Sequence, residues 1–363
     1  MINLRKRITV SIMPTYACYR DCKYCYIPED LRKGGPADPV PLSIDKIAER
    51  LTEVCNSKED DSIQARAYGT PTYRSYTIAR IELYGGDLGL LKEDYLKKLH
   101  DTCSLFANDV HIIINDVDKA LNCGFKEDHI NVSLNMCRSD YDKNLKILRE
   151  YPSTTALIVV TRDEIRRGAE AVLKPLVEMG VIKQVTFIPL SNQDYKEPFK
   201  DILAPGETIR NAVLNKEYAQ FMIDVFTYLY ENDNKIIVTN ASDIRDSVDD
   251  EVISMKKSLQ IPVGPEMEGN VFITPSGNFA CVEFLANGGE HFREFTHLRG
   301  WEKECTNDYF KRRGRCSSCE YFNNCLAEHV KSKTEDVTTL LWEDSCNGYP
   351  ELIEWAKEHK GWI

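Results

Sequence analysis

Strand-like and helical segments alternate along residues 8–190, and this alternation constrains the fold more than any other feature of the sequence. Each strand-like run is short and rich in β-branched residues, and helical runs with periodic apolar residues lie between them. Residues 43–55 show the helical pattern clearly, with Ser43 in position to cap the first turn. The expected strands are residues 8–13, 79–86, 109–116, 129–135, 155–161 and 183–190. The main expected helices are residues 43–55, 92–107, 139–151, 167–180 and 215–233.

A chain that alternates strands and helices in this way builds a parallel sheet with helices packed outside it. The six strands are fewer than the eight that close the usual barrel of parallel strands. We therefore predict an α/β fold whose core is a partial, open (β/α)6 barrel of the TIM type.

The pattern changes after the sixth strand. Residues 191–210 are polar with scattered prolines, which predicts a loop or lid. Residues 269–284 predict a β-hairpin that turns at residues 275–278, and a cysteine-rich tail follows it. We place the domain boundary near residue 262, so that residues 1–262 form the barrel and residues 263–363 form a small cysteine-rich domain of hairpin and helices.

The composition is that of an ordinary globular protein. The net charge of −11 over 363 residues argues against nucleic acid as a partner. No apolar run reaches the length of about 18 residues that a membrane span needs, so no membrane segment is expected. The N-terminus lacks a signal-peptide cleavage site. Thirteen cysteines in such a chain favour metal binding in the cytoplasm over disulfide bonding.

Three cysteines crowd into the sequence CYRDCKYC, shortly after the first expected strand. Cys18, Cys22 and Cys25 have C-x3-C-x2-C spacing, and three such thiolates can hold three corners of an iron–sulfur cluster. The fourth corner then stays open for an exogenous ligand. The motif lies at the carboxyl end of a strand, where barrels place their active sites. A structural zinc ion is the alternative, but it normally has four protein ligands, and no fourth lies near this motif.

At this motif the chain resembles the radical SAM superfamily, with Tyr24 in the aromatic position of the family's cysteine pattern. The family has a partial (β/α)6 barrel. The resemblance implies that Cys18, Cys22 and Cys25 bind a [4Fe-4S] cluster whose open iron chelates S-adenosylmethionine (SAM). An electron from a donor such as flavodoxin or ferredoxin then splits SAM, and the resulting 5′-deoxyadenosyl radical abstracts hydrogen from a substrate.

The resemblance extends to the ends of later strands. The family places the sequence GGE after its second strand, near the methionine amino group, and this chain has YGGD there, with a shorter carboxylate. Polar residues at the fourth and fifth strand ends are expected near the ribose or carboxylate of SAM, although ordinary strand-end residues are the alternative. The SAM-binding candidates are Tyr24, Gly85, Gly86, Asp87, Ser133, Asn135 and Thr161.

A second cysteine cluster lies near the C-terminus, where CSSCEYFNNC has C-x2-C-x5-C spacing and one more cysteine follows about twenty residues later. Four thiolates so arranged satisfy a closed zinc or iron–sulfur site. The tail resembles the SPASM extension of many radical SAM enzymes, which implies an auxiliary [4Fe-4S] cluster. The implied ligands are Cys316, Cys319, Cys325 and Cys346.

The hairpin before the tail also resembles SPASM proteins, and Cys281 matches the hairpin cysteine of their inner auxiliary cluster. The other inner-cluster cysteines are missing, and His329 stands at one of their positions, so we expect this second cluster to be absent. A shortened, twitch-like site that recruits Cys281 is the alternative. Glu283 follows two residues later and is a candidate general base, with an ordinary solvated strand glutamate as its alternative.

Enzymes with this tail often modify peptides, so the expected substrate is a ribosomally made peptide whose residues are cross-linked, epimerised or oxidised. Oxidation or rearrangement of a small metabolite such as a sugar or cyclitol is the alternative, and a zinc-binding interaction protein without catalysis is a third. Because the first strand begins at residue 8, we expect a leader peptide to be bound by a separate protein, by the lid, or by the tyrosine-rich insertion at residues 56–77.

Overall fold

The computed structural model describes most of the barrel and parts of the C-terminal region, and the statements below concern those residues. They are residues 6–20, 22, 25, 27, 29–33, 40–56, 76–189, 213, 215–249, 270–285, 292–303 and 350–363.

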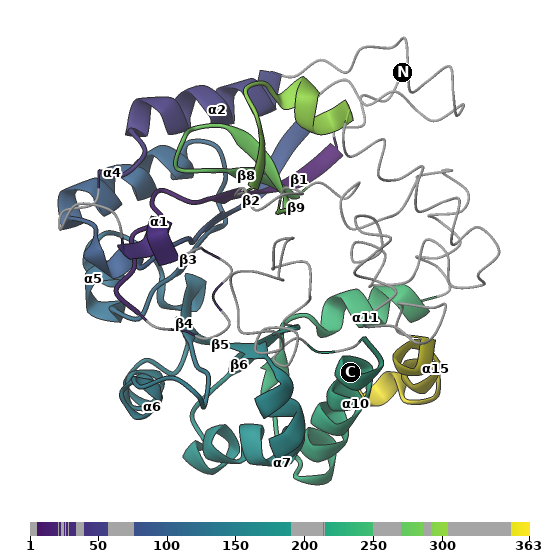
Figure 1. The fold of residues 1–363 in the computed structure, drawn as a ribbon. Coiled ribbons are helices and arrows are strands. Elements are labelled where there is room, and N and C mark those ends of the chain that lie inside the picture. The colour runs from purple at the N-terminus through teal and green to yellow at the C-terminus, as the bar shows by residue number, and fades with distance from the viewer. Residues whose placement is uncertain are drawn as a thin grey trace, which may run out of the picture.

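A single curved sheet runs through the described part of the chain, with the strand order β10-β9-β8-β1-β2-β3-β4-β5-β6-β7. Each neighbouring pair from β1 to β7 is parallel, and the sheet curls into an open barrel (Figure 1). This confirms the predicted α/β architecture, with a very short seventh strand added. The parallel strands are β1 (Lys6–Ile12), β2 (Tyr76–Leu83), β3 (Val110–Ile113), β4 (Ile130–Ser133), β5 (Thr155–Val160), β6 (Gln184–Pro189) and β7 (Ile237–Val238).

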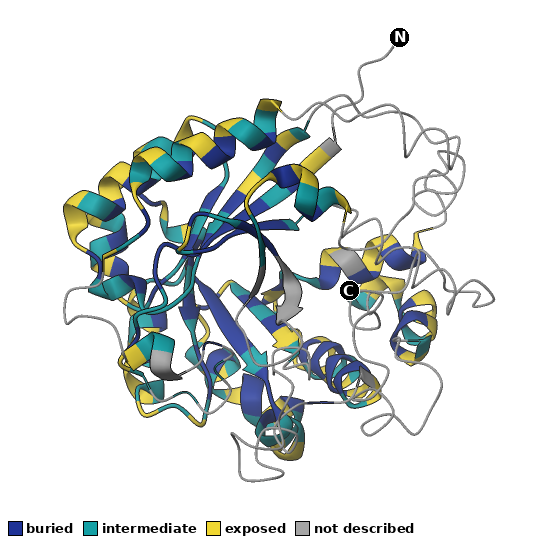
Figure 2. Ribbon diagram, turned by 45° about the horizontal axis from the view of Figure 1, so that its top comes forward, coloured by how far each residue is buried: buried dark blue, intermediate teal, exposed yellow. Residues whose placement is uncertain are grey.

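Helices cover the outer face of the sheet, and their buried sides face the strands while their exposed sides face outward (Figure 2). The apolar core lies in this layer between sheet and helices. The helices are α1 (Glu29–Lys33), α2 (Ile44–Asn56), α4 (Glu93–Ser104), α5 (Val117–Asn122), α6 (Tyr141–Glu150), α7 (Arg162–Met179), α10 (Asn215–Glu231), α11 (Ala241–Val248) and α15 (Pro350–Glu358), with short 3-10 turns at Leu88–Leu90, Glu127–His129 and Lys360–Trp362. No described helix is both long and apolar enough to cross a bilayer.

Capping side chains fix where two of these helices begin. The backbone N–H of Lys46 donates to Ser43 Oγ at 3.2 Å, as expected for the start of α2. Helix α7 begins at Arg162, five residues before the predicted start, because Thr161 and Glu164 form a reciprocal capping box there. The predicted start coincides with a kink at Gly168, whose φ of +82° interrupts the helix.

The predicted hairpin is confirmed as β8 (Asn270–Ile273) and β9 (Phe279–Leu285), which pair antiparallel. Thr274 and Asn278 close its turn through a backbone hydrogen bond of 3.0 Å. Strand β8 pairs in parallel with β1, and β10 (Phe292–Phe295) adds to β9, so the hairpin extends the barrel sheet at its first strand. The domain boundary near residue 262 lies outside the described residues and stays a prediction.

Candidate functional site

The three cysteines of the N-terminal motif lie in the loop that follows the carboxyl end of β1. Cys18 is buried, Cys22 and Cys25 are half-buried, and all three thiols are free. The N–H of Cys25 donates to the carbonyl of Cys22 at 3.0 Å, which turns the loop back on itself. The N–H of Cys18 donates to the carbonyl of Arg32 at 3.1 Å, so the end of α1 is tied to the loop. The loop therefore gathers the thiols that the sequence predicted as cluster ligands.

The surroundings of Cys18 and Cys25 raise the pKa of both thiols and so favour their protonated form. Burial raises the pKa of Cys25 to about 11, and the opposing charge of Arg32 offsets only part of this rise. Burial also raises the pKa of Cys18, and Asp87 and Cys22 add to the rise. Because a metal binds thiolates, loading this site must release protons.

The three cysteine sulfurs are not all as close to one another as the ligands of a single metal ion would be. A zinc ion with bonds of about 2.3 Å to sulfur would need its ligands within roughly 4 Å of one another. Within the described residues, the only His, Cys, Asp and Glu ligand atoms that come within 4.8 Å of one another in a group of three belong to a different site. At least one pair of the three sulfurs is therefore more than 4.8 Å apart.

Two glycines after β2 pack directly against the backbone that leads into Cys18. The N–H of Gly86 donates to Thr15 O at 2.9 Å, and the next N–H, that of Asp87, donates to Ala17 O at 2.8 Å. A Cβ on Gly86 would lie 2.1 Å from Ala17 O, and one on Gly85 would lie 2.7 Å from Thr15 O. Gly85 also has a φ of +136°, which side chains rarely allow. The glycine pair thus lets the two loops touch through their backbones.

The carboxylate of Asp87 faces the cysteine loop. One of its oxygens accepts a hydrogen bond from Arg20 Nε at 2.9 Å, and the other accepts from the N–H of Gly89 at 3.1 Å. Arg20 lies between Cys18 and Cys22 and also forms an ion pair with Asp140, which follows β4. In this structure Asp87 therefore anchors the cysteine loop, and its predicted contact with SAM stays a prediction.

The candidates at the ends of β4 and β5 serve the scaffold in this structure. The Asn135 side chain is fully buried and donates to Val159 O at 2.6 Å, which joins the ends of the two strands. Thr161 is buried and accepts a hydrogen bond from the N–H of Asp163 at 3.1 Å as the cap of α7. Ser133 is half-buried, and its N–H donates to Asn115 Oδ1 at 3.0 Å. Their roles toward SAM remain predictions.

Several predicted site residues lie where the structure gives no side chain. Tyr24 and His329 are outside the described residues, as are the four tail cysteines Cys316, Cys319, Cys325 and Cys346. Cys281 and Glu283 occupy strand β9, but their side chains are not described. The auxiliary cluster and the general base therefore stay predictions.

Cys137 is a further cysteine near the site, and the sequence offered no reason to count it among the candidate ligands. It is exposed and follows β4 by a few residues. Desolvation of its sulfur and the nearby Glu164 raise the pKa of this thiol, and the charge of Cys22 contributes to the rise. Its place just past a strand end was the only sequence signal that connected it with the cysteine loop.

No family model and no curated protein matches the sequence. Solved structures do match its fold. The anaerobic sulfatase-maturating enzyme anSMEcpe, with bound AdoMet and the Cp18Cys peptide, aligns with a TM-score of 0.57 at 14% identity, covering 96% of each chain. SuiB of Streptococcus suis bound to S-adenosylmethionine aligns at 0.54 and 12% identity, covering 93% of this chain and 75% of SuiB.

Both of these proteins are radical SAM enzymes with a SPASM domain. The chain therefore shares the fold of these two enzymes, in agreement with the open barrel that the sequence predicted. The alignment with SuiB bound to its precursor peptide SuiA agrees, with a TM-score of 0.53 at 13% identity over 94% of this chain.

Proposed function

We propose that this protein is a radical SAM enzyme that modifies a peptide. The observation that carries the proposal is the loop after β1, which holds Cys18, Cys22 and Cys25 and whose backbone contacts the glycine turn after β2 at the carboxyl ends of the barrel strands. Barrels place their active sites at this end of the strands. The donor set suits a [4Fe-4S] cluster with one open iron.

The cluster, when bound, supplies the electron that splits SAM into methionine and a 5′-deoxyadenosyl radical. The chain itself holds the cluster through three thiolates and fixes their loop through Arg20 and Asp87. The buried bridge from Asn135 to β5 holds two neighbouring strand ends in place, so that a substrate in the barrel meets a rigid rim. A preorganised rim of this kind positions the reacting hydrogen.

A peptide is the favoured substrate because two neighbours in the fold comparison are described with peptides, Cp18Cys for anSMEcpe and the precursor SuiA for SuiB. The proposal includes an auxiliary [4Fe-4S] cluster on Cys316, Cys319, Cys325 and Cys346, in keeping with the SPASM domain of both neighbours. Which bond the enzyme forms or breaks after hydrogen abstraction is not part of the proposal.

The test begins with anaerobic reconstitution of the full chain with iron and sulfide. With dithionite and SAM, the wild type should form 5′-deoxyadenosine, and iron should approach about eight atoms per chain for two clusters. The triple change of Cys18, Cys22 and Cys25 to Ala should remove about half of the iron and all SAM cleavage. Cys55→Ala is a matched control, because Cys55 is half-buried on α2 and distant in sequence from the motif.

The peptide assignment needs its own readout. A precursor peptide encoded beside the gene should increase 5′-deoxyadenosine formation and change in mass, whereas a panel of sugars and cyclitols should do neither. SAM cleavage by the triple variant would refute the cluster assignment. Stimulation by a sugar alone would refute the peptide assignment and leave the cluster assignment standing.

A further inference from the structure

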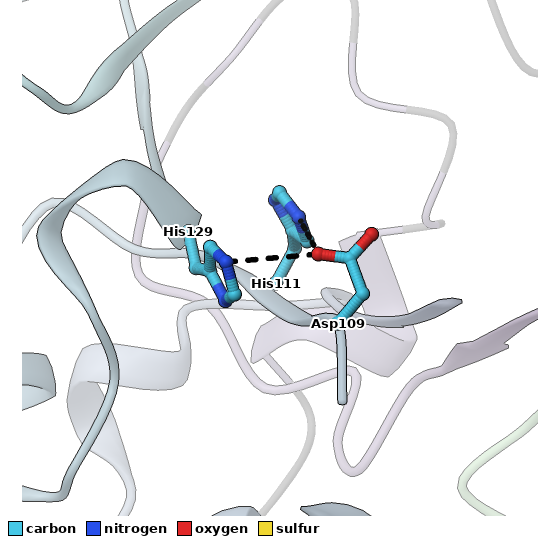
Figure 3. A group of neighbouring side chains, drawn as sticks. All are labelled: Asp109, His111 and His129. Carbon is cyan, nitrogen blue, oxygen red and sulfur yellow. Dashed lines mark hydrogen bonds and ion pairs between the residues drawn. The ribbon is translucent and has the colours of Figure 1, made fainter. Parts of the chain in front are cut away.

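A second group of potential metal ligands lies at the other end of the barrel. Asp109, His111 and His129 each present one ligand atom, and these atoms all lie within 4.8 Å of one another. Figure 3 shows both imidazole rings directed at the carboxylate, with both dashed lines ending on the same oxygen. His111 Nε2 lies 2.7 Å and His129 Nε2 lies 3.7 Å from Asp109 Oδ1.

The parallel sheet brings these residues together although the two histidines are eighteen positions apart in the sequence. Asp109 directly precedes β3, His111 is the second residue of β3, and His129 directly precedes β4. Strands β3 and β4 are parallel neighbours, so their amino ends meet at one edge. The cysteine loop follows the carboxyl end of β1, and the two groups therefore occupy opposite ends of the barrel strands.

The spacing of the three ligand atoms suits one small cation. Zinc bonds to nitrogen and oxygen of about 2.0–2.1 Å place tetrahedral ligands roughly 3.3–3.4 Å apart. The observed separations from the shared oxygen, 2.7 and 3.7 Å, lie on either side of that value. Side-chain movements of less than an ångström would bring both into range.

A neighbouring arginine holds the carboxylate in the required orientation. Arg80 Nε donates to Asp109 Oδ2 at 2.7 Å, which leaves Oδ1 facing the two imidazoles. Outer partners of this kind orient ligating carboxylates in metal sites. The two imidazole rings stack with centroids 4.6 Å apart and planes 13° apart, so one ring must turn before both Nε2 lone pairs can point at the same ion.

We propose that Asp109, His111 and His129 bind a divalent transition-metal ion, for which zinc is the natural probe. Two imidazoles and one carboxylate are typical ligands for such an ion, and three protein ligands leave a coordination position open. The side chains of the two histidines are 18% and 17% exposed and that of Asp109 is 34% exposed, so an ion can reach them from solvent. This site is independent of the proposed radical chemistry.

The positive charge of Arg80 repels a cation bound to the three ligands. Two carboxylates beside Arg80 offset part of this repulsion. Arg80 already pairs with Asp109 and lies 3.9 Å from the Glu82 carboxylate. Glu82 also stands opposite His111 in the register of β2 and β3, which adds a second carboxylate to the surroundings. The competing interpretation is a hydrogen-bonded cluster of these side chains that binds no metal.

The experiment measures zinc binding to the reconstituted holoenzyme, whose cysteine sites are already filled with iron and sulfide. After treatment with a chelator, the protein is dialysed against Zn²⁺ of known free concentration, and zinc and iron per chain are counted by mass spectrometry. His111→Gln and His129→Gln are the test variants. His100→Gln is the matched control, because His100 is similarly half-buried, at 20% exposure, and packs on Phe125 in another part of the barrel.

We expect the wild type and His100→Gln to bind one more zinc per chain than either test variant. The test variants should need about 100-fold more free zinc or higher, because losing a ligand costs more than the 10–100-fold typical for an outer partner. Unchanged iron content and an unchanged circular dichroism spectrum would show that the variants are folded. Because there are two test variants, the experiment still decides the question if one of them misfolds. Equal zinc binding by the wild type and both folded variants would overturn the proposal.

Discussion

Substituting Gly86 by alanine tests whether backbone contact between the two loops creates the cysteine site. The new Cβ would lie 2.1 Å from Ala17 O and 2.7 Å from both the carbonyl carbon and oxygen of Tyr16. Real Cβ atoms essentially never approach other heavy atoms closer than 3.0 Å, so one loop must move by nearly an ångström. The atoms in the way belong to the backbone, and no side chain can rotate to relieve the clash. The backbone that would move, at Tyr16 and Ala17, leads directly into Cys18.

The cost can be estimated from overpacking in protein cores, which typically destabilises by about 1–3 kcal/mol. We expect a value near the upper end, about 3 kcal/mol, because backbone must shift. This corresponds to a fall in Tm of about 4 °C for a chain of this size. Displacement of Cys18 should also lower the iron bound at the N-terminal site and, with it, 5′-deoxyadenosine formation.

The assay combines calorimetry of the unloaded chain with iron counting after anaerobic reconstitution. Gly361→Ala is the matched control, because a Cβ there meets nothing within 4 Å. We expect the control to keep its Tm and iron content. If Gly86→Ala kept a wild-type Tm and full iron, the close approach of the two loops would be wrong. Contact between their backbones would then not be what positions the cysteine site.

Three further predictions follow from the same region. Arg20→Gln removes partly buried ion pairs to Asp87 and Asp140, and it should lower the free energy of unfolding by about 1–3 kcal/mol and reduce the bound iron. The control Arg166→Gln, whose ion pair is largely exposed, should change the Tm by less than 1 °C. The Cys25 thiol has a pKa of about 11 in the folded chain against 9.0 as its ordinary value, so the unfolded chain loses this proton first as pH rises. The free energy of unfolding of the unloaded protein should therefore fall by roughly 3 kcal/mol as the pH rises from 9 through 11, and Cys25→Ala or cluster loading should abolish that loss. Thr161→Ala should cost about 1 kcal/mol through its lost cap and leave the KM for SAM unchanged, and a raised KM with an unchanged Tm would instead assign Thr161 to the cofactor.

The sequence predicted the barrel because each strand is a short apolar run between turn signals. Local signals placed Ser43 at the start of α2 correctly. The start of α7 was misjudged because Thr161 and Glu164 form a capping box whose residues were assigned to the end of a strand and to a loop. Strand β10 was not predicted, since it is only four residues long and its sequence FREF does not alternate apolar and polar residues.

Contacts between distant residues could not be predicted from the sequence. Arg20 and Asp87 are 67 positions apart, and nothing local indicates that the carboxylate turns toward the cysteine loop. The Asp109 group likewise depends on the register of β3 and β4, which a single sequence does not fix. The cysteine motif itself was predictable because its chemistry depends on local spacing.

The parallel pairing of β8 with β1 has a consequence for the order of events during synthesis. Strand β1 carries the cysteine loop, and its partner on one side, β2, ends at Leu83, whereas its partner on the other side, β8, ends at Ile273. A ribosome adding about 5–20 residues per second needs roughly 10–40 s to make the chain between those two points. During that interval one edge of β1 has no strand beside it, and such an edge is prone to pair with other chains. If iron and sulfide were bound while the chain was still being made, the cysteine loop would lie on a sheet that lacks β8. We therefore expect the metal site to be loaded after the full chain has been released.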